Sequence, residues 1–340
     1  MTADPVWPAP GPNTDERGGA VERPLTVDEA SYVAAARAPN TLRGYRSDWA
    51  EFTQWCADRG DPSLPATAAA VSGYLTALAV AGAKVGTISR RLSAIRFAHQ
   101  MADAPDPTRA ARVVAVWEGI RRRHGAPPEQ SAPLMPPELF DVVAACPATR
   151  EFKTRPAEPD LAGLRDRALL LVGFFGAMRR SELTALTVAQ ISTHDRGLVL
   201  SLPHSKTNQT GAHAELVVLP RARRPEHCPV TALRTWLHAA TITDGPVLRK
   251  VSTGNRVLDH TMHPESVNKR VQVAVERAGL TDGPYSAHSL RAGFVTYAHL
   301  RGASDHAIAH QTRHRSLASV STYVRVHQAW DNNAATMLGI

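Results

Sequence analysis

Two short polar stretches near the C-terminal end of the sequence carry most of its information. Residues 288–291 read His-Ser-Leu-Arg, and residues 312–315 read Thr-Arg-His-Arg and are followed by Tyr323. Residues three apart share one face of a helix, so His288 and Arg291 can point at one spot. An arginine can bind two phosphate oxygens, and a neighbouring histidine can exchange a proton near neutral pH. Basic residues that converge on one tyrosine, with no grouped carboxylates to hold a metal, indicate metal-free attack on a phosphate.

Tyr323 stands out among the six tyrosines of the chain. A free tyrosine has a pKa of about 10, so it needs cationic neighbours or a base before it can act as a nucleophile. Only Tyr323 follows such a His/Arg segment, with His314 nine residues before it. Tyr45 and Tyr74 fall on apolar helical stripes, where a core position is expected. The pattern predicts Tyr323 on a short helix over residues 316–323.

Two segments further upstream add cationic groups. An apolar helix breaks at Gly176 and arginines follow at once, which would fix the backbone of Arg179 beside a cleft. Ser181 is the expected N-cap of the next helix. The alternative for Arg179 is an arginine that compensates a helix dipole. Lys206 lies in the predicted turn of a β-hairpin, from which its ammonium could give a proton to a leaving oxygen; a solvated loop lysine is the alternative there.

The composition favours a polyanionic partner. The 340 residues include 39 Lys and Arg against 31 Asp and Glu, a balance that suits nucleic acid but also fits a solvated basic surface. Most of these cations are arginine, which is suited to planar phosphate recognition, although a GC-rich genome would give the same bias. A chain of this length is long enough for two domains with a well-buried core.

Several other classes of protein are disfavoured. Three cysteines that lie far apart, without a CxxC pair, argue against a disulfide framework or a zinc site. No apolar run reaches membrane-spanning length and there is no signal peptide, so we expect a cytoplasmic protein without a membrane partner. His306, His310 and His314 have the helical spacing of metal ligands, but no HExxH glutamate lies between them. We therefore expect neither a metal nor another cofactor.

Proline content and helical periodicity divide the chain into four segments. Residues 1–37 are rich in Pro and Gly and are expected to form a disordered or loosely ordered tail. Residues 38–124 show only helical periodicity and predict a small all-α domain, with Thr87 as the N-cap of its third helix. Residues 125–136 are typical of a Pro-rich linker. Residues 137–340 predict a second domain with a C-terminal tail.

The second domain is predicted to be mainly α-helical with one small antiparallel β-hairpin, which makes it an α+β domain. Residues 198–202 and 215–219 predict the two strands, and Asn208 and Gly211 lie in the turn between them. Helices are expected over residues 137–146, 160–177, 181–186, 229–240, 264–278, 286–301, 304–311 and 316–323, and the last helix of the first domain over residues 108–123.

The order of the polar groups is more specific than any one of them. An Arg and a Glu, a hairpin Lys, a His-x-x-Arg, a His and a Tyr follow one another along the chain. This order resembles the catalytic domain of the tyrosine recombinases, the phage-integrase family with its Cre-like and Xer-like members. The resemblance covers about residues 38–330, because residues 41–45 look like the first helix of the family's DNA-clamping domain. The positions that match the family's catalytic residues are Arg179, Lys206, His288, Arg291, His314 and Tyr323, and Glu182 matches the acidic residue after the first arginine.

Two departures from the family pattern stand beside these matches. The usual Thr-Gly before the first arginine is Gly176-Ala177 here, and the usual Gly before the second histidine is Arg313. Neither change removes a catalytic group. Arg313 could alter how tightly the active-site helix packs.

The resemblance implies phosphoryl transfer without metal or ATP. Arg179 and Arg291 would bind the non-bridging oxygens of one scissile phosphate and neutralise the charge of the transition state. Tyr323 would attack the phosphorus, form a 3′-phosphotyrosyl link and release a 5′-hydroxyl. The covalent link would conserve the energy of the broken bond, so that another 5′-hydroxyl could reverse the step.

The remaining catalytic residues and the partners follow from the same resemblance. Lys206 would protonate the leaving oxygen, His288 would exchange the tyrosine proton, and His314 would hydrogen-bond the phosphate. Members of the family act as homo-tetramers on double-stranded DNA with paired inverted half-sites, which is the partner expected here.

The candidates for DNA contact lie mostly in the first domain. No acidic residue occurs between Asp61 and Asp103, whereas several cations do. Arg90 and Arg96 avoid the apolar face of their predicted helix, which makes it the candidate groove-facing helix. The alternative is that these arginines only solvate the domain. The full candidate set is Thr41, Arg43, Lys84, Arg90, Arg91, Arg96, Arg121 and Arg122.

Two other functions fit parts of this pattern. A type IB DNA topoisomerase shares the Arg/Lys/Arg/His/Tyr chemistry but relaxes supercoils as a monomer. The helical first domain and the spacing of the polar groups favour recombination over relaxation. A non-catalytic, sequence-specific DNA-binding protein would have a decayed site, whereas all six catalytic residues are present here.

Overall fold

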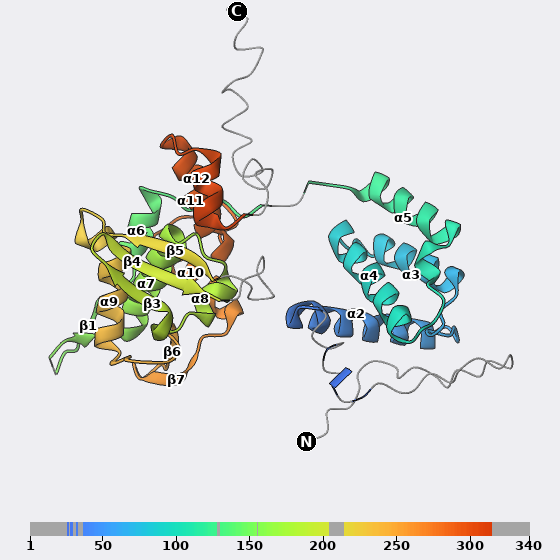
Figure 1. Ribbon diagram of the computed structural model, residues 1–340, viewed down its shortest axis with the longest axis horizontal. Coiled ribbons are helices and arrows are strands. Elements are labelled where there is room, and N and C mark those ends of the chain that lie inside the picture. The colour runs from blue at the N-terminus through green and yellow to red at the C-terminus, as the bar shows by residue number, and fades with distance from the viewer. Residues whose placement is uncertain are drawn as a thin grey trace, which may run out of the picture. The chain divides into compact units, whose positions relative to one another are not determined.

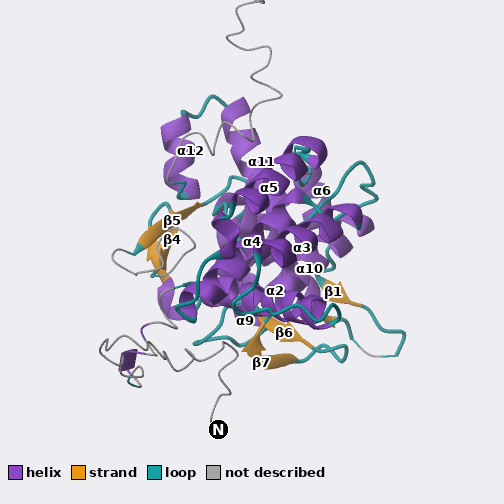
Figure 2. Ribbon diagram, turned by 90° about the vertical axis from the view of Figure 1, so that its right-hand side faces the viewer, coloured by secondary structure: helices purple, strands orange, loops and turns teal. Residues whose placement is uncertain are grey.

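The computed structural model describes residues 26, 28–29, 32, 37–127, 130–154, 156–203 and 214–314. The chain divides into two compact units, Met1–Pro128 and Glu129–Ile340. Among the described residues the first unit is built from helices, and the second adds short strands to helices (Figures 1 and 2). The expected fold class, mainly helical with a small antiparallel hairpin or sheet in the second unit, is therefore confirmed, and the described residues form further small sheets there.

Four α-helices form the described core of the first unit. Their bounds are α2 Pro39–Ala57, α3 Ala68–Val80, α4 Val85–Met101 and α5 Ala111–His124. Helix α2 packs against α4, and α3 packs against α5. The apolar stripe expected on the first helix is confirmed, because Trp49, Phe52 and Cys56 are buried in this core. The ring of Tyr74 packs edge-on against Phe52, with 5.1 Å between their centroids.

Helix α4 begins earlier than the sequence predicts. Its first residue is Val85, and Lys84 before it is extended and makes no side-chain cap. The expected N-cap at Thr87 is therefore wrong. At the end of α3 the chain reverses through Gly82, which has a φ of +78°, and the amide of Ala83 returns to the last turn of α3. This tight reversal lets the next helix start at once, so Thr87 lies inside its first turn.

The last helix of the first unit is preceded by a separate turn. Pro107–Arg109 form a short 3-10 helix, η1, and Ala110 is extended with a ψ of 137°. The carboxylate of Asp106 caps this turn by accepting the backbone N–H of Thr108 at 3.0 Å. The single helix expected from residue 108 is therefore two elements.

Helix α7 is the centre of the second unit. It is almost wholly apolar and buried between Ala168 and Phe174, and it packs against α6, α9, α10, α11 and strand β5. Asp160 caps it by accepting the N–H of Gly163 at 2.7 Å. The helices are α6 Glu138–Ala144, α7 Leu161–Phe175, α8 Arg180–Ala185, α9 Pro229–Ala239, α10 Pro264–Arg277, α11 Ala287–Leu300 and α12 Asp305–Thr312. Each lies within two residues of its expected range, and the helix expected over residues 316–323 lies outside the described residues.

The expected β-hairpin is part of a three-stranded antiparallel sheet in the order β3-β4-β5. Strands β4 Gly197–Leu202 and β5 Glu215–Pro220 pair with Leu200 opposite Val217, as the hairpin requires. Strand β3, Ile191–His194, adds an edge that the sequence did not predict. Two smaller antiparallel pairs join β1 Thr149–Arg150 to β2 Glu158–Pro159, and β6 Arg249–Val251 to β7 Val257–Thr261.

The end of the proline-rich segment is bound to helix α11. The N–H of Leu134 donates to the carbonyl of Ser289 at 2.9 Å, and the side chain of Leu134 is fully buried. The hydroxyl groups of Ser131 and Ser286 lie 2.8 Å apart. The backbone of Leu134 passes so close to Gly293 that a side chain there would overlap it. Residues 131–134 therefore form a strap along the helix that carries His288 and Arg291.

Gly293→Ala is expected to destabilise the second unit, because the added methyl group would overlap the carbonyl of Leu134. Overpacking of this kind costs about 1–3 kcal/mol. Calorimetric unfolding of the full chain measures the loss. Gly119→Ala in α5 is the control, since its Cβ would meet nothing within 4 Å and alanine is the better helix former. An unchanged transition of the second unit in Gly293→Ala would contradict the close approach of the strap.

Candidate active site

The turn between α7 and α8 presents Arg179. After α7 the chain passes through Ala177, which has a left-handed φ of +44°, and through Met178, which is fully buried. Arg179 is the extended residue directly before α8. The expected N-cap at Ser181 is therefore wrong, because α8 begins one residue before it. The reversal at Ala177 and the burial of Met178 allow the helix to restart at that point.

Glu182 holds Arg179 in place. Its Oε1 accepts from Nη1 of Arg179 at 2.6 Å, and its Oε2 accepts the backbone N–H of Arg179 at 2.9 Å. The carboxylate thus closes the N-terminus of α8, as a glutamate in the third helical position can. Burial alone would raise the pKa of Glu182, but the guanidiniums of Arg313 and Arg179 and the N–H of Arg179 hold that pKa below its ordinary range. Glu182 is therefore ionised at neutral pH.

Arg291 lies on α11, one helical turn after His288, and is only 2% exposed. Its Nη1 donates to the carbonyl of Ala177 at 2.6 Å, and its Nη2 donates to the carbonyl of Thr312 at 2.5 Å. The guanidinium therefore joins the turn after α7 to the end of α12. His288, in the first turn of the same helix, is exposed.

The end of α12 positions His314. The helix closes at Arg313, whose φ of +58° and ψ of 42° are left-handed. Nδ1 of His314 lies 2.7 Å from the hydroxyl oxygen of Thr312, and that hydroxyl donates to the carbonyl of Ile308 at 2.7 Å. The hydroxyl oxygen is then the acceptor from Nδ1–H of His314, which leaves Nε2 as the acceptor nitrogen of the neutral ring.

Burial and positive charge keep His314 neutral. Burial, followed by the charges of Arg291, Arg179, Arg313 and His288, lowers the pKa of His314 from 6.5 to about 4. Arg179, His288 and Arg291 therefore lie close enough to His314 for their charges to lower its pKa. The structure brings Arg179, His288, Arg291 and His314 together at the ends of α7 and α12 and the start of α11.

Two predicted catalytic residues, Lys206 and Tyr323, lie outside the described residues and stay predictions. The sequence analysis did not single out Thr312, although a hydroxyl two residues before His314 was a weak signal. It noted Arg313 only as a departure from the family pattern. A left-handed backbone at a residue other than glycine has no signature in the sequence.

The arginines of α4 are bound within the first unit. Arg90 donates twice to Asp48, at 2.8 and 2.9 Å, and that carboxylate is almost completely buried. Arg91 donates to the hydroxyl of Tyr74 at 2.9 Å and forms an ion pair with Asp48 at 3.8 Å. Arg96 donates to the η1 turn at 3.0 Å. These three side chains hold α4 against its neighbours, and DNA contact by them stays a prediction.

The other candidates for DNA contact differ in their exposure. Thr41 is partly buried in the first turn of α2, whereas Arg43, Lys84, Arg121 and Arg122 are exposed. Arg121 and Arg122 lie in the last turn of α5, where cations also complement the helix dipole.

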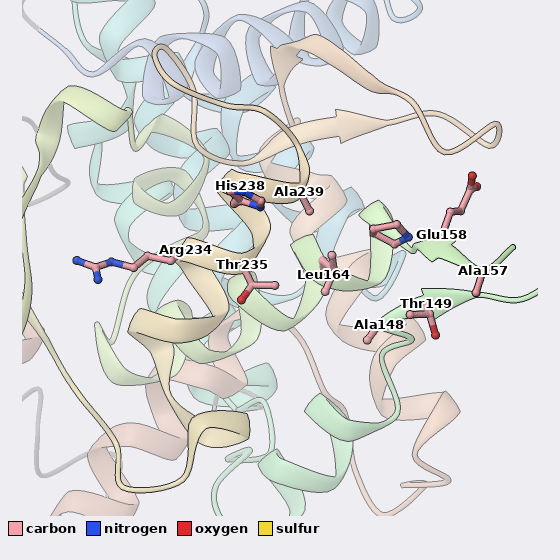
Figure 3. A pocket seen from close by; sticks show the side chains of 10 residues that line it. Ala148, Thr149, Ala157, Glu158, Leu164, Arg234, Thr235, His238 and Ala239 are labelled. Atoms are coloured by element: carbon pink, nitrogen blue, oxygen red, sulfur yellow. The ribbon is translucent and has the colours of Figure 1, made fainter.

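A separate hollow of about 620 Å³ lies in the second unit, between the β1–β2 pair, the start of α7 and α9 (Figure 3). Glu158, Arg234 and His238 are among its lining residues, and it shares none with the cluster around Arg291. In the part of the chain that the structure describes, no three His, Cys, Asp or Glu residues gather as a metal would require. The described helices also include none long and apolar enough to cross a membrane.

Comparison with known proteins connects this geometry to a family. Residues 152–329 match the phage integrase family, and residues 31–104 match the phage integrase, N-terminal SAM-like domain. An integrase/recombinase XerD homolog of Selenomonas ruminantium is 33% identical over 313 residues, which cover 91% of this chain and 88% of that protein. The tyrosine recombinase XerD of Rhizobium meliloti is 24% identical, covering 92% of each chain.

The chain belongs to the phage integrase family. It is a Xer-like tyrosine recombinase, a site-specific enzyme that cleaves and rejoins DNA. Its fold agrees, because a lambda integrase dimer bound to a COC′ core site has the same fold with a TM-score of 0.56, at 18% identity over 87% of this chain and 93% of that one. Membership favours recombination over the topoisomerase and the non-catalytic binding protein.

The recombinase without DNA is expected to keep His314 neutral down to a pH of about 4. When the pKa of a histidine is lower in the folded than in the unfolded state, its contribution to stability is fully present at pH values above the pKa of the unfolded state. That stability is lost as the pH falls from 6.5 towards 4. Nuclear magnetic resonance of the His314 ring measures the titration directly.

His314→Gln is the control for this titration. It should remove part of the loss of stability between pH 6.5 and 4, measured by urea unfolding at a series of pH values. A ring that titrates near pH 6.5 in the DNA-free protein would contradict the buried, cation-rich environment.

Proposed function

We propose that this recombinase cleaves DNA through a covalent 3′-phosphotyrosyl intermediate, without metal or ATP. The observation that carries the proposal is the convergence of Arg179, His288, Arg291 and His314 on one place, with both arginines held by buried acceptors. Their guanidiniums would bind the non-bridging oxygens of one phosphate and stabilise the charge of its transition state.

The bond changes follow from the family chemistry. The phenolic oxygen of Tyr323 attacks the phosphorus, a new phosphorus–oxygen bond forms, and the bond to the 5′-oxygen breaks. The tyrosine proton passes to His288, and Lys206 gives a proton to the departing 5′-oxygen. Because the phosphotyrosyl link conserves the energy of the broken bond, the 5′-hydroxyl of a partner strand can reverse the step.

His314 has a role that depends on protonation. With Nδ1–H donating to the hydroxyl of Thr312, Nε2 is the acceptor nitrogen of the ring and carries no proton at neutral pH. A bound phosphate anion raises the pKa of a neighbouring histidine. His314 therefore becomes a hydrogen-bond donor to the phosphate when DNA is bound.

The partner is double-stranded DNA with paired inverted half-sites, on which four copies of the chain assemble. A lambda integrase is known as a dimer on its core site, and a XerH recombinase as a complex with a palindromic substrate, which supports this choice of DNA. The chain works in the cytoplasm, on the nucleoid if the cell is bacterial. Base contacts made by the first unit determine which DNA sequence the protein selects.

DNA contact is assigned to the first domain, residues 38–124, and the catalytic domain is residues 137–340; of the expected linker over residues 125–136, residues 131–134 are bound along α11. The tail, residues 1–37, precedes both. The contacting residues are Thr41, Arg43, Lys84, Arg90, Arg91, Arg96, Arg121 and Arg122. Removing Arg90 would take two hydrogen bonds from the buried carboxylate of Asp48, leave it the longer ion pair with Arg91, and destabilise the domain.

Tyr323→Phe should bind DNA and never become covalently attached to it. The substrate is a duplex selected by the Tyr323→Phe protein from a random-sequence pool and then nicked beside the selected half-site, so that cleavage is trapped. Wild-type protein is expected to give a covalent adduct on a denaturing gel. Tyr285→Phe is the matched control and should form the adduct as the wild type does. An adduct with Tyr323→Phe would overturn the choice of nucleophile.

Arg121→Gln and Arg122→Gln should each reduce the salt dependence of DNA binding by about one counterion and lower the melting temperature only slightly. Both side chains are exposed at the end of α5, so besides a phosphate contact they would lose their interaction with the helix dipole, which contributes about 0.3–1 kcal/mol. The slope of log affinity against log salt is the measurement. Arg90→Ala is the contrast, since it should lower stability as well as affinity. Unchanged slopes for both glutamine variants would remove this helix end from the interface.

A further inference from the structure

Arg313 combines a strained backbone with an almost completely buried charge. Its φ of +58° is left-handed, a conformation that costs roughly 1–2 kcal/mol for residues with a side chain. Its side chain is only 4% exposed. A long cation in such a place needs acceptors on several sides, because an unpaired buried charge is far more costly than the backbone strain.

The guanidinium of Arg313 has three hydrogen-bond acceptors and, in addition, one longer ion-pair contact. Nη2 donates to Oε2 of Glu182 on α8 at 2.6 Å. Nη1 donates to the carbonyl of Gly176 after α7 at 3.2 Å and to the carbonyl of Gln311 on α12 at 3.0 Å. Nε lies 3.5 Å from Oε2 of Glu215 on β5. Arg313 therefore ties the end of α12 to the turn that presents Arg179.

Glu182 connects Arg313 to Arg179. One carboxylate oxygen accepts from the guanidinium of Arg179 at 2.6 Å, and the other accepts from Arg313 at the same distance. If Arg313 were absent, Glu182 and Glu215 would lose the cation that both of them contact. Arg179, Glu182 and Glu215 would then carry one positive and two negative charges, which would weaken the attraction of Arg179 for a phosphate. With Arg313 in place, the two carboxylates are offset by a second cation.

We propose that Arg313 is a positioning residue for DNA cleavage, which acts through Glu182 to keep the guanidinium of Arg179 oriented towards the scissile phosphate and its charge available to that phosphate. The inference rests on the proposed function of Arg179 as a phosphate ligand. The site takes a phosphodiester anion, and Arg313 supports that site from behind without touching the substrate.

An electrostatic role of Arg313 and a merely structural role predict different effects of Glu182→Gln. If Arg313 only fastens α12, then Glu182→Gln can restore the melting temperature of a chain that lacks Arg313, because it removes a buried charge left without its partner, but it should not restore the cleavage rate of the folded protein. If Arg313 offsets that charge, then Glu182→Gln should restore activity to a chain that lacks Arg313. The effect of Glu182→Gln therefore changes sign between the two backgrounds, which a double-mutant cycle detects.

The experiment measures the rate of adduct formation on the nicked, selected duplex at saturating DNA, in the full chain. Arg313→Met keeps the length and backbone strain but removes the charge, and we expect cleavage about 10–100-fold slower, as for other groups that orient a reactive centre. Arg313→Lys retains the charge and should lie within a few-fold of wild type. Glu182→Gln should slow the wild type but accelerate Arg313→Met.

Arg313→Gly is the control for an effect on folding. It relieves the left-handed strain, so it should fold at least as readily as Arg313→Met, yet it should cleave as slowly and be rescued in the same way. Melting temperatures of all variants are recorded beside the rates. Wild-type rates in Arg313→Met, or a Glu182→Gln effect that is equal in both backgrounds, would overturn the proposal.

A second readout does not depend on cleavage. The charge of Arg313 is among the causes that lower the pKa of His314, so Arg313→Met should raise that pKa and Arg313→Lys should not. An unchanged His314 titration in Arg313→Met would count against the proposal. A failure of the proposed function would give another result. Wild-type protein would then form no adduct, or Tyr323→Phe would form one, whichever residue occupies position 313.

Discussion

The catalytic unit depends on the buried guanidinium of Arg291. Its two hydrogen bonds join the carbonyl of Ala177, just beyond α7, to the carbonyl of Thr312 at the end of α12. Carbonyl groups at the C-terminal end of a helix lack partners inside the helix and carry the negative end of its dipole, so a cation is a suitable partner there. Removing the guanidinium would leave two buried carbonyl groups unpaired, each of which costs about 1–3 kcal/mol. The helix that carries Arg291 is therefore fixed by the groups that also define the site.

Arg313, beside Arg291, also binds carbonyl groups at helix ends. It donates to the carbonyl groups of Gly176 and Gln311, so that two arginines bind four carbonyl groups at the ends of α7 and α12. Helix ends thus gather positive charge in a small volume and need only one fully buried carboxylate, Glu182, to hold Arg179. Burial, together with this concentration of positive charge, lowers the pKa of His314 to about 4. The site is arranged for an anion before any anion arrives.

The sequence predicted the elements of the catalytic unit well but not their connections. Helical periodicity and the His-x-x-Arg spacing placed α11, because both depend on local geometry. Strand β3 was missed because its residues are mostly exposed and show no alternation, and its hydrogen bonds come from β4. The expected caps at Thr87 and Ser181 were wrong because a reversal just before each helix decides where it starts. That Arg291 would be buried against two carbonyl groups could not be predicted, since both acceptors lie far away in the sequence.

The two places where this chain lacks the family's usual glycine are both left-handed, at Ala177 and Arg313. A left-handed backbone is what glycine adopts without strain, so the structure gives a physical reason for the usual residue. Each substitution costs roughly 1–2 kcal/mol in backbone strain. Ala177 adds only a buried methyl group, and its carbonyl still accepts from Arg291. Arg313 adds a charge that reaches Glu182, and through it Arg179. The first departure is therefore a local adjustment of packing, whereas the second changes the electrostatics of the group that would bind the phosphate.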